Sequence, residues 1–261
     1  MPLSTINNGA SSATARANIN AAITGLNNAS GPDVIYVSSI GNDTTGDGSL
    51  AKPFLTAQKG FDIGQATSQP FMLDLSVGYY SIINQASSGY LKTVRGQSEQ
   101  LTTLSFNASA PAISNDNGAN GGVITLCIQD IHCLCYVSGG NVTVNDGNSY
   151  TPGNGGEITL TGHGIFSAYA SGGSIDASAS TGGNGGTINL SGSLTLKDGE
   201  LAAGGGSSGG GTGTAGAEGT ITADGCNLRG LTSVAGYTTF GRCSYGTAIS
   251  PSNNVGGNAV F

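Results

Sequence analysis

The chain has 261 residues, of which 9% are charged, 37% are hydrophobic and 46 are glycine. Disordered chains are kept open by high charge and low hydrophobicity, so this composition predicts an ordered protein rich in turns and close backbone contacts. The formal net charge of -7 argues against nucleic acid as a partner, because binding phosphate requires a basic face. No apolar run approaches the roughly 20 residues of a membrane helix, so we expect no membrane insertion.

Residues 1–32 form the first predicted segment, in which apolar residues recur at three- and four-residue steps over 11–27. This pattern predicts an amphipathic helix that ends before Gly31 and Pro32. One short helix with a narrow apolar stripe cannot bury that stripe alone. We therefore expect it to dock on other protein surface through the anchor residues Ile19, Ile23 and Leu26. The segment lacks the basic and apolar regions of a signal peptide, which predicts synthesis in a cytoplasm.

The stretch IYVSSIGNDTTGDGSLAKPFLTAQKGFDIGQA, residues 35–66, is the most patterned part of the chain. The run Ile-Tyr-Val at its start predicts a strand, and GNDTTGDGS predicts a turn. Pro53 suits the first turn of a helix, and the residues on one face of that helix would be Phe54, Ala57 and Phe61. We expect a helix near 54–63 that caps the strands after it.

Two features of the sequence raise the question of a metal site. In the turn, Asp43, Thr45 and Asp47 have the spacing of a calcium loop, but Phe54 stands where such a loop needs a bidentate acid. The five cysteines are odd in number and have no CxxC spacing, which argues against a disulfide framework and against zinc. We expect a structural turn, no metal, no cofactor and reduced thiols that behave as small hydrophobic side chains.

A sequence repeat follows two predicted strand pairs, PFMLDLSVGYYSI and LKTVRGQSEQLTTLSF. The pattern Gly-Gly-x-Ile-x-Leu begins at residues 121, 155 and 185, and a related pattern begins at Glu218, so the steps are 34, 30 and 33 residues by subtraction. A repeat of about 20–50 residues indicates a solenoid or array. Helical periods are absent after about residue 66, so the predicted solenoid is built of β-strands.

Equivalent residues of successive repeats are expected to stack in columns. The predicted columns place Ile124, Leu126 and Ile128 under Ile158 and Leu160, then under Ile188 and Leu190, and then under Ile221. The glycine pairs are predicted to be corners, where the chain turns between faces. Residues 204–219, GGGSSGGGTGTAGAEG, have almost no apolar content and leave two alternatives open. They form either a long mobile loop or glycine strands packed against one another or against a sister chain.

Three stretches resemble known protein families. YVSSIGNDTTGDGSLAKPFLTAQKGFDIG resembles the N-terminal signature of pectate-lyase-like right-handed parallel β-helices, and VRGQSEQLTTLSF is similar to an early-coil pattern of the same group. STINNGASSATARANINAAI resembles N-terminal segments of bacteriophage tail-fibre and tail-spike proteins. Together these resemblances imply a mainly β virion protein, a right-handed parallel β-helix with a short N-terminal helix and a capping helix.

The same resemblances imply an organisation and partners. Residues 1–32 would be a helical anchor, 33–225 the β-helix body with its capping helix and glycine-rich loops, and 226–261 a C-terminal cap or tip. Phage fibres of this build are generally homotrimers attached through their N-termini to other virion proteins. The chain would therefore be made in the bacterial host cytoplasm and function on the virion.

Enzymatic activity has to be considered, because this fold often cleaves polysaccharides with paired carboxylates or with acids that hold calcium. In the repeat region Asp198 and Glu200, in LKDGEL, are the only close acidic pair and the only catalytic candidates. Such a cluster is more often a solvated turn. Sugar clefts usually offer aromatic faces, yet no aromatic residue lies between Tyr169 and Tyr237 and the chain has no tryptophan. We therefore favour a protein without catalytic activity.

Aromatic residues return in the C-terminal stretches GYTTFGRCSYG and NAVF. They would either close the last repeat or form an exposed tip, and arginine together with tyrosine is typical of contact surfaces. The candidates for receptor binding are Tyr237, Phe240, Arg242 and Tyr245. Three functions follow: a fibre or spike that attaches to a host-surface glycan, a capsid-decorating head fibre, or a polysaccharide depolymerase (lyase or glycosidase). Carboxylates shared between neighbouring subunits would restore the third.

Overall fold

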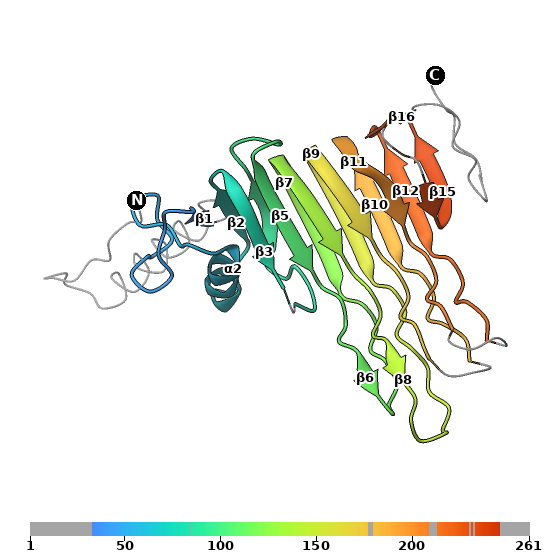
Figure 1. The fold of residues 1–261 in the computed structure, drawn as a ribbon. Helices are drawn as coiled ribbons and strands as arrows, with labels where there is room; N and C mark the ends of the chain where they lie inside the picture. Colours follow the sequence, from blue (N-terminus) through green and yellow to red (C-terminus); the bar gives the residue numbers. More distant parts are fainter. Residues whose placement is uncertain are drawn as a thin grey trace, which may run out of the picture. The chain divides into compact units, whose positions relative to one another are not determined.

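A computed structural model describes residues 33–83, 85–176, 180–208, 213–229, 231 and 233–245. The predicted N-terminal helix, with Ile19, Ile23 and Leu26, lies outside these residues, as does Phe261. The described chain is mainly β, with one helix and a 14-stranded sheet in which the paired strands are parallel (Figure 1). Among the described residues, no helix has the length and apolar character needed to cross a membrane.

Two rows of parallel strands make up the large sheet, and both rows follow the order of the chain. The first row contains β1 (Asp33–Val37), β2 (Phe71–Leu75), β4 (Leu91–Arg95), β7 (Val123–Tyr136), β9 (Glu157–Tyr169), β10 (Thr187–Ser191), β12 (Thr220–Asp224) and β15 (Tyr237–Gly241). The second row contains β3 (Gly78–Ile82), β5 (Thr102–Asn107), the later parts of β7 and β9, β11 (Ser193–Ala202), β13 (Asn227–Leu228), β14 (Ser233–Ala235) and β16 (Ser244–Tyr245). A small separate sheet pairs β6 (Ile113–Ser114) with β8 (Val142–Thr143). One pass of the chain through both rows is called a layer below.

The stacking of equivalent residues is confirmed by the strand register. Ile158 lies between Ile124 and Ile188 in neighbouring strands, and Ile188 pairs in turn with Ile221. The leucine column is also confirmed, and Ala223 continues it in β12. All these side chains are buried, because the inward positions of each strand alternate with outward ones. The repeat therefore builds one continuous apolar core.

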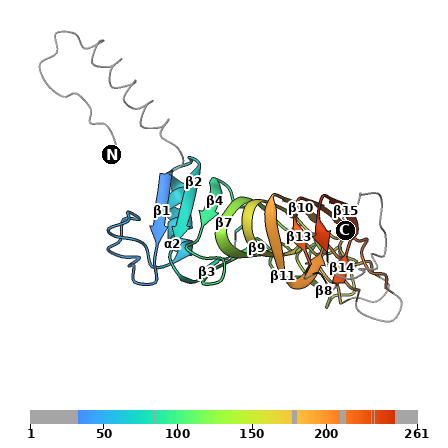
Figure 2. The same cartoon turned by 90° about the horizontal axis from the view of Figure 1, so that it is seen from above.

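The helix, α2, spans Ala57–Ala66 and thus begins later than the predicted position near residue 54. Thr56 is its N-cap, and the Thr56 hydroxyl accepts a hydrogen bond from the Lys59 amide at 3.2 Å. Phe54 instead forms a parallel bridge with Val37. Its side chain is nevertheless buried, as are those of Ala57 and Phe61. The helix packs against β2, β3 and β4 at the start of the stack (Figure 2). Its Phe61 belongs to the same hydrophobic core as the buried side chains of the first layers.

The glycine pairs of the repeat are not corners, which corrects the prediction from the sequence. In β9 and in the two layers after it, the corners between the two rows are single glycines with positive φ, at Gly162, Gly192 and Gly225. The second glycine of each pair lies instead where backbones touch: a Cβ on Gly156 would overlap the carbonyl oxygen of Gly122, and one on Gly186 would overlap that of Gly156. Close backbone approach, and not left-handed geometry, explains why these positions are glycine.

Between the second row and the next strand of the first row, the chain extends away from the sheet and returns (Figure 1). We call the segments that leave the sheet outgoing arms, at 138–142, 171–175 and 204–208, and those that come back returning arms, at 117–122, 151–156, 181–186 and 213–219. Neighbouring arms are joined by backbone hydrogen bonds, for example from Gly206 to Gly183 at 2.7 Å and from Gly216 to Gly206 at 2.9 Å. Of the two alternatives for 204–219, packed glycine strands therefore hold for 204–208 and 213–219.

The hydrogen bonds of the arms have a three-residue period. The amides of Gly182 and Gly185 donate to the next returning arm, at Thr214 and Ala217. The amides of Gly183 and Gly186, one position later in each case, donate to the carbonyls of Gly173 and Ala170. These acceptors lie in, or directly before, the preceding outgoing arm. Three residues per turn without internal hydrogen bonds is the geometry of a polyproline II helix. The arms thus have the hydrogen-bonding period of extended polyproline II helices. They are joined by backbone hydrogen bonds and by side chains such as Asn154 and Asn184, whose Oδ1 atoms accept amide hydrogen bonds from the next returning arm.

Candidate functional site

The predicted receptor-binding residues all belong to the last layer, but their side chains differ in exposure to solvent. Tyr237 begins β15 and its side chain is 47% exposed. Phe240 is partly buried and packs against the hydrophobic core. Tyr245 ends β16, and its side chain lies outside the described part of the chain. Among the three side chains that are described, Tyr237 is the one that presents an aromatic face to solvent.

The side chain of Arg242 forms an ion pair with Asp224. Its Nε donates to Asp224 Oδ1 at 2.9 Å, and its Nη2 donates to Asp224 Oδ2. The hydrogen bonds from Arg242 lower the pKa of the Asp224 carboxyl, and the same pairing raises the pKa of Arg242. Because Asp224 and Gly241 are partners in the register of β12 and β15, this ion pair joins the last two layers. Arg242 therefore has a structural partner that the sequence did not indicate.

The predicted catalytic pair is described in its backbone alone. Asp198 and Glu200 lie in β11, where Glu200 pairs with Ser233, and their side chains are outside the described part. Elsewhere in the repeat, a surface pair joins His163 Nε2 to Asp130 Oδ1 at 3.0 Å across two layers. No cluster of three or more His, Cys, Asp or Glu side chains occurs in the described chain.

The turn with calcium-like spacing has a structural use. The Asp43 carboxylate accepts hydrogen bonds from the amides of Leu55 and Thr56, at 2.8 and 3.0 Å, and from the Thr56 hydroxyl at 2.7 Å. Burial raises the pKa of Asp43, but these hydrogen bonds and nearby Lys59 outweigh burial and lower the pKa overall. Asp47 accepts the Ser49 amide at 3.0 Å. Both carboxylates thus order the turn that leads into α2, as a structural turn requires.

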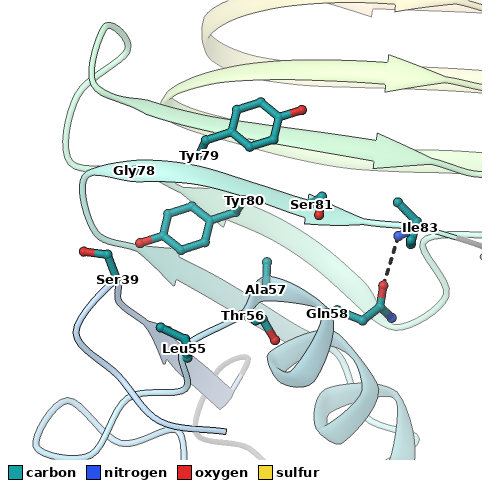
Figure 3. Close-up of a pocket in the computed structure, with 10 residues that line it drawn as sticks. All are labelled: Ser39, Leu55, Thr56, Ala57, Gln58, Gly78, Tyr79, Tyr80, Ser81 and Ile83. Atoms are coloured by element: carbon teal, nitrogen blue, oxygen red, sulfur yellow. Dashed lines mark hydrogen bonds between the residues drawn. The ribbon is translucent and has the colours of Figure 1, made fainter.

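A surface hollow of about 370 Å³ lies beside this turn, between the start of α2 and β3 (Figure 3). Its lining residues are Ser39, Leu55, Thr56, Ala57, Gln58, Gly78, Tyr79, Tyr80, Ser81 and Ile83. Tyr79 and Tyr80 point to opposite sides of β3, so Tyr79 is 68% exposed while Tyr80 is buried and shares a 2.8 Å hydrogen bond with Ser76. The hollow was not predicted, because a Tyr-Tyr doublet does not reveal which ring faces solvent.

The lining of the hollow suits contact rather than catalysis. Gln58 is fixed by two hydrogen bonds, from Nε2 to Asp62 at 2.8 Å and from the Ile83 amide to Oε1 at 2.9 Å. The exposed side chains are an aromatic ring, two aliphatic groups and the hydroxyls of serine and threonine, and none of the lining residues is ionisable except the two tyrosines. An aromatic face beside hydroxyl groups is a surface on which a sugar ring or a short peptide can rest.

Tyr79 and Tyr237 are thus exposed on different layers of the stack. Each lies on a described strand, and the residues that line the hollow beside Tyr79 include no carboxylate pair of the kind that hydrolysis of a glycosidic bond requires. No protein-family model, curated protein or solved structure matches the chain.

Proposed function

We propose that the protein is a structural component of a bacteriophage virion, a fibre or spike that contributes to host-surface attachment without catalysis. The observation that carries this proposal is the in-register parallel stacking of successive layers, from β2 and β4 to β12 and β15. Such stacking is what a right-handed parallel β-helix would produce, and we propose that fold for the body. The stretch at 4–23, which resembles phage tail-fibre and tail-spike segments, supports the virion assignment, and the stretch at 36–64, which resembles pectate-lyase-like β-helices, supports the proposed fold.

A homotrimer is the proposed assembly. The core of each layer is small, and exposed apolar side chains such as Val77, Ile83 and Leu101 remain next to the ends of described strands. Burial of such groups against sister chains would add stability that a slender core lacks. Light scattering of the full chain at micromolar concentration should give three times the mass of 25.6 kDa. A monomeric mass would contradict the trimer.

Attachment to a polysaccharide is proposed to use the exposed face of Tyr237 in the last layer. The purified protein would be incubated with surface polysaccharide from candidate host cells, while retained protein and newly formed reducing ends are measured together. We expect retention without new reducing ends, and we expect Tyr237→Ala to weaken retention at least several-fold because the aromatic face is lost. The matched variant Tyr79→Ala, which removes a ring from a different layer, should retain binding.

Each other result of this experiment selects a different function. New reducing ends would favour the depolymerase and direct attention to Asp198, Glu200 and carboxylates of neighbouring subunits. Loss of retention in Tyr79→Ala alone would move the binding site to the hollow of Figure 3. Neither retention nor release would leave a purely architectural protein. Antibody labelling of particles in electron micrographs would then separate a tail fibre from a capsid-decorating head fibre.

A further inference from the structure

Cys226 and Cys243 occupy equivalent positions in the last two layers. The strands β13 and β16 are parallel and pair Asn227 with Ser244, so the residues directly before them are also neighbours. The Ser244 amide donates to the Cys226 carbonyl at 3.0 Å, which fixes this register. Both side chains point into the core and are 1% exposed. Two thiols therefore face each other across adjacent layers.

The geometry of this pair is compatible with a covalent bond. Neighbouring strands of a sheet lie about 4.8 Å apart, and disulfides span Cα separations of about 4.4–6.8 Å. Cys243 Sγ donates a hydrogen bond to the carbonyl oxygen of Ala223, in the layer of Cys226, at 3.4 Å, and the two thiols shift each other's pKa in opposite directions. Little backbone movement is then needed to bring the sulfur atoms into bonding distance.

The two thiols are chemically unequal. The hydrogen bond from Cys226 stabilises the thiolate of Cys243 and lowers its pKa, although burial acts in the opposite direction. The same hydrogen bond and burial raise the pKa of Cys226. Because the thiolate is the attacking form in thiol–disulfide exchange, Cys243 is suited to be the first nucleophile and Cys226 the resolving thiol.

We propose that Cys226 and Cys243 form a disulfide on exposure to a low-molecular-weight disulfide such as oxidised glutathione. The Cys243 thiolate attacks one sulfur of the small disulfide, forms a mixed disulfide and releases one small thiolate. Cys226 then gives up its proton to solvent, and its sulfur attacks Cys243 Sγ and releases the second small thiol. Two protein thiols are oxidised and one small disulfide is reduced to two thiols, so the step balances.

The disulfide between Cys226 and Cys243 would link the last two layers of the stack covalently. Within the described chain, β15 pairs with β12 and β16 pairs with β13, each on one side only. A crosslink between these layers restricts the unfolded chain and resists fraying of the last layer. Disulfides persist outside reducing cytoplasm, so the bond would form after release from the cell in which the chain is made. The chemistry itself does not depend on the proposed virion location.

Cys133 and Cys135 provide an internal comparison. Their sulfur atoms are 3.5 Å apart, but both belong to β7, in the middle of the stack, and both are fully buried. The hydrogen bond with Cys133 and burial raise the pKa of Cys135 well above its usual range. This pair lies in the middle of the stack and its raised pKa disfavours the thiolate. It should therefore stay reduced under the conditions that oxidise Cys226 and Cys243, which lie in end layers that open more easily.

The test uses the full chain treated with oxidised glutathione, followed by intact mass, thiol titration in denaturant and peptide mapping. We expect a loss of about 2 Da, from the two thiol hydrogens. Of the five cysteines, three should still titrate, because five minus two is three. The map should contain one crosslinked peptide joining Cys226 to Cys243. Five free thiols, or a crosslink between any other pair, would overturn the proposal.

Variants separate the roles of the two thiols. Cys226→Ser should stop at the mixed disulfide on Cys243, visible as one glutathione adduct, whereas Cys243→Ser should react at neither position. Cys133→Ser is the control, and its crosslink should form as in the parent chain. An adduct that accumulates on Cys226 in place of Cys243 would contradict the assigned order. If either end-layer variant fails to fold, the peptide map of the parent chain still decides whether the bond forms.

Discussion

Gly156 and Gly186 show how a single missing side chain can determine the fold of a layer. The position of a Cβ on Gly186 is taken by the carbonyl oxygen of Gly156, and that on Gly219 by the carbonyl oxygen of Gly186. The obstacle is backbone, which cannot rotate away as a flexible side chain can. A methyl group at one position would therefore push two layers apart and weaken the hydrogen bonds between them.

The first prediction compares two glycines of this region. Gly186→Ala should lower the free energy of unfolding by about 2–3 kcal/mol, since overpacking costs of this size are typical where neighbours cannot move. Gly204→Ala is the matched control, because the nearest atom to its added Cβ is Ala235 Cβ at 3.5 Å, an ordinary contact. It should change stability by less than about 0.5 kcal/mol. Denaturant titration followed by circular dichroism measures both, and equal effects would refute the steric explanation.

The second prediction concerns Asp43 and acid. Its pKa is lowered in the folded protein, so the stability it contributes is present above the unfolded-state value near 3.8 and is lost as pH falls through the folded value. Asp43→Asn should remove this acid-sensitive component and cost about 1 kcal/mol at neutral pH. Unfolding titrations from pH 7 to pH 2 of the variant and of Asp116→Asn, a surface control, test this. A parallel loss of stability in the control would contradict a specific role.

The contacts of Arg242 and the exposure of Tyr79 could not be predicted from the sequence. Arg242 was predicted to be a contact residue, but its partner Asp224 is 18 positions away and is brought close only by the pairing of β12 with β15. Tyr79 was not singled out, because the direction of its ring depends on the strand register. Residue type alone predicts that a tyrosine or an arginine makes contacts, but not whether those contacts are within the chain.

At the scale of elements, α2 depends on aromatic packing as much as on its cap. Phe61 makes edge-to-face contacts with Phe71 of β2 and Phe106 of β5, with ring centroids 6.3 and 5.6 Å apart. Gly60 and Gly64 lie on the same buried side of the helix, and a Cβ on Gly64 would overlap the Phe71 ring. The helix can approach the strands closely because those two positions carry no side chain.

The third prediction follows from this packing. Phe61→Ala should destabilise the protein by about 3–5 kcal/mol, the usual cost of emptying a buried phenylalanine site. Ile63→Ala, on the same helix but 39% exposed, should cost much less. Thermal unfolding monitored by circular dichroism compares the two variants. If their melting temperatures fall equally, general helix propensity and not the Phe61 contacts would explain the loss.

The sequence predicts the strands of the repeat better than the start of α2 or the role of the glycine pairs. The repeat of Ile and Leu predicted both the strands and their register, because inward positions of stacked parallel strands must be apolar in every layer. The start of α2 was placed too early, because Asp43, more than ten residues away, holds the amides of Leu55 and Thr56 outside the helix. The glycine pairs were misread because glycine serves equally for positive φ and for close backbone contact.

At the scale of the whole described body, each layer contacts mainly the layers before and after it. The strongest contacts between elements join β7 to β9, in the middle of the stack, while β13 and β16 share far fewer. Repeat proteins of this kind gain stability from neighbour interactions, and their ends open first. The described chain should therefore have a gradient of local stability along its layers.

The fourth prediction tests that gradient by hydrogen exchange with mass spectrometry. Amides of β7 and β9 should exchange most slowly, and those of β15 and β16 should exchange at least tenfold faster, because the end layers open without disrupting the centre. Oxidation of the Cys226–Cys243 pair should slow exchange in β16 and leave β7 unchanged. Uniform exchange along the chain would mean that the body opens as one cooperative unit.

The glycine arms also determine how stability should change with temperature. The heat capacity of unfolding rises with newly exposed apolar surface and falls with newly exposed polar surface. The arms bury peptide groups against peptide groups, as between Gly206 and Gly183, and contribute few apolar side chains. Calorimetry should therefore give a heat capacity change of unfolding, per residue, below the usual ~12–15 cal/mol/K. A flatter stability curve would follow, so that the protein loses less of its folding free energy on cooling or warming than a domain of equal size with a conventional core.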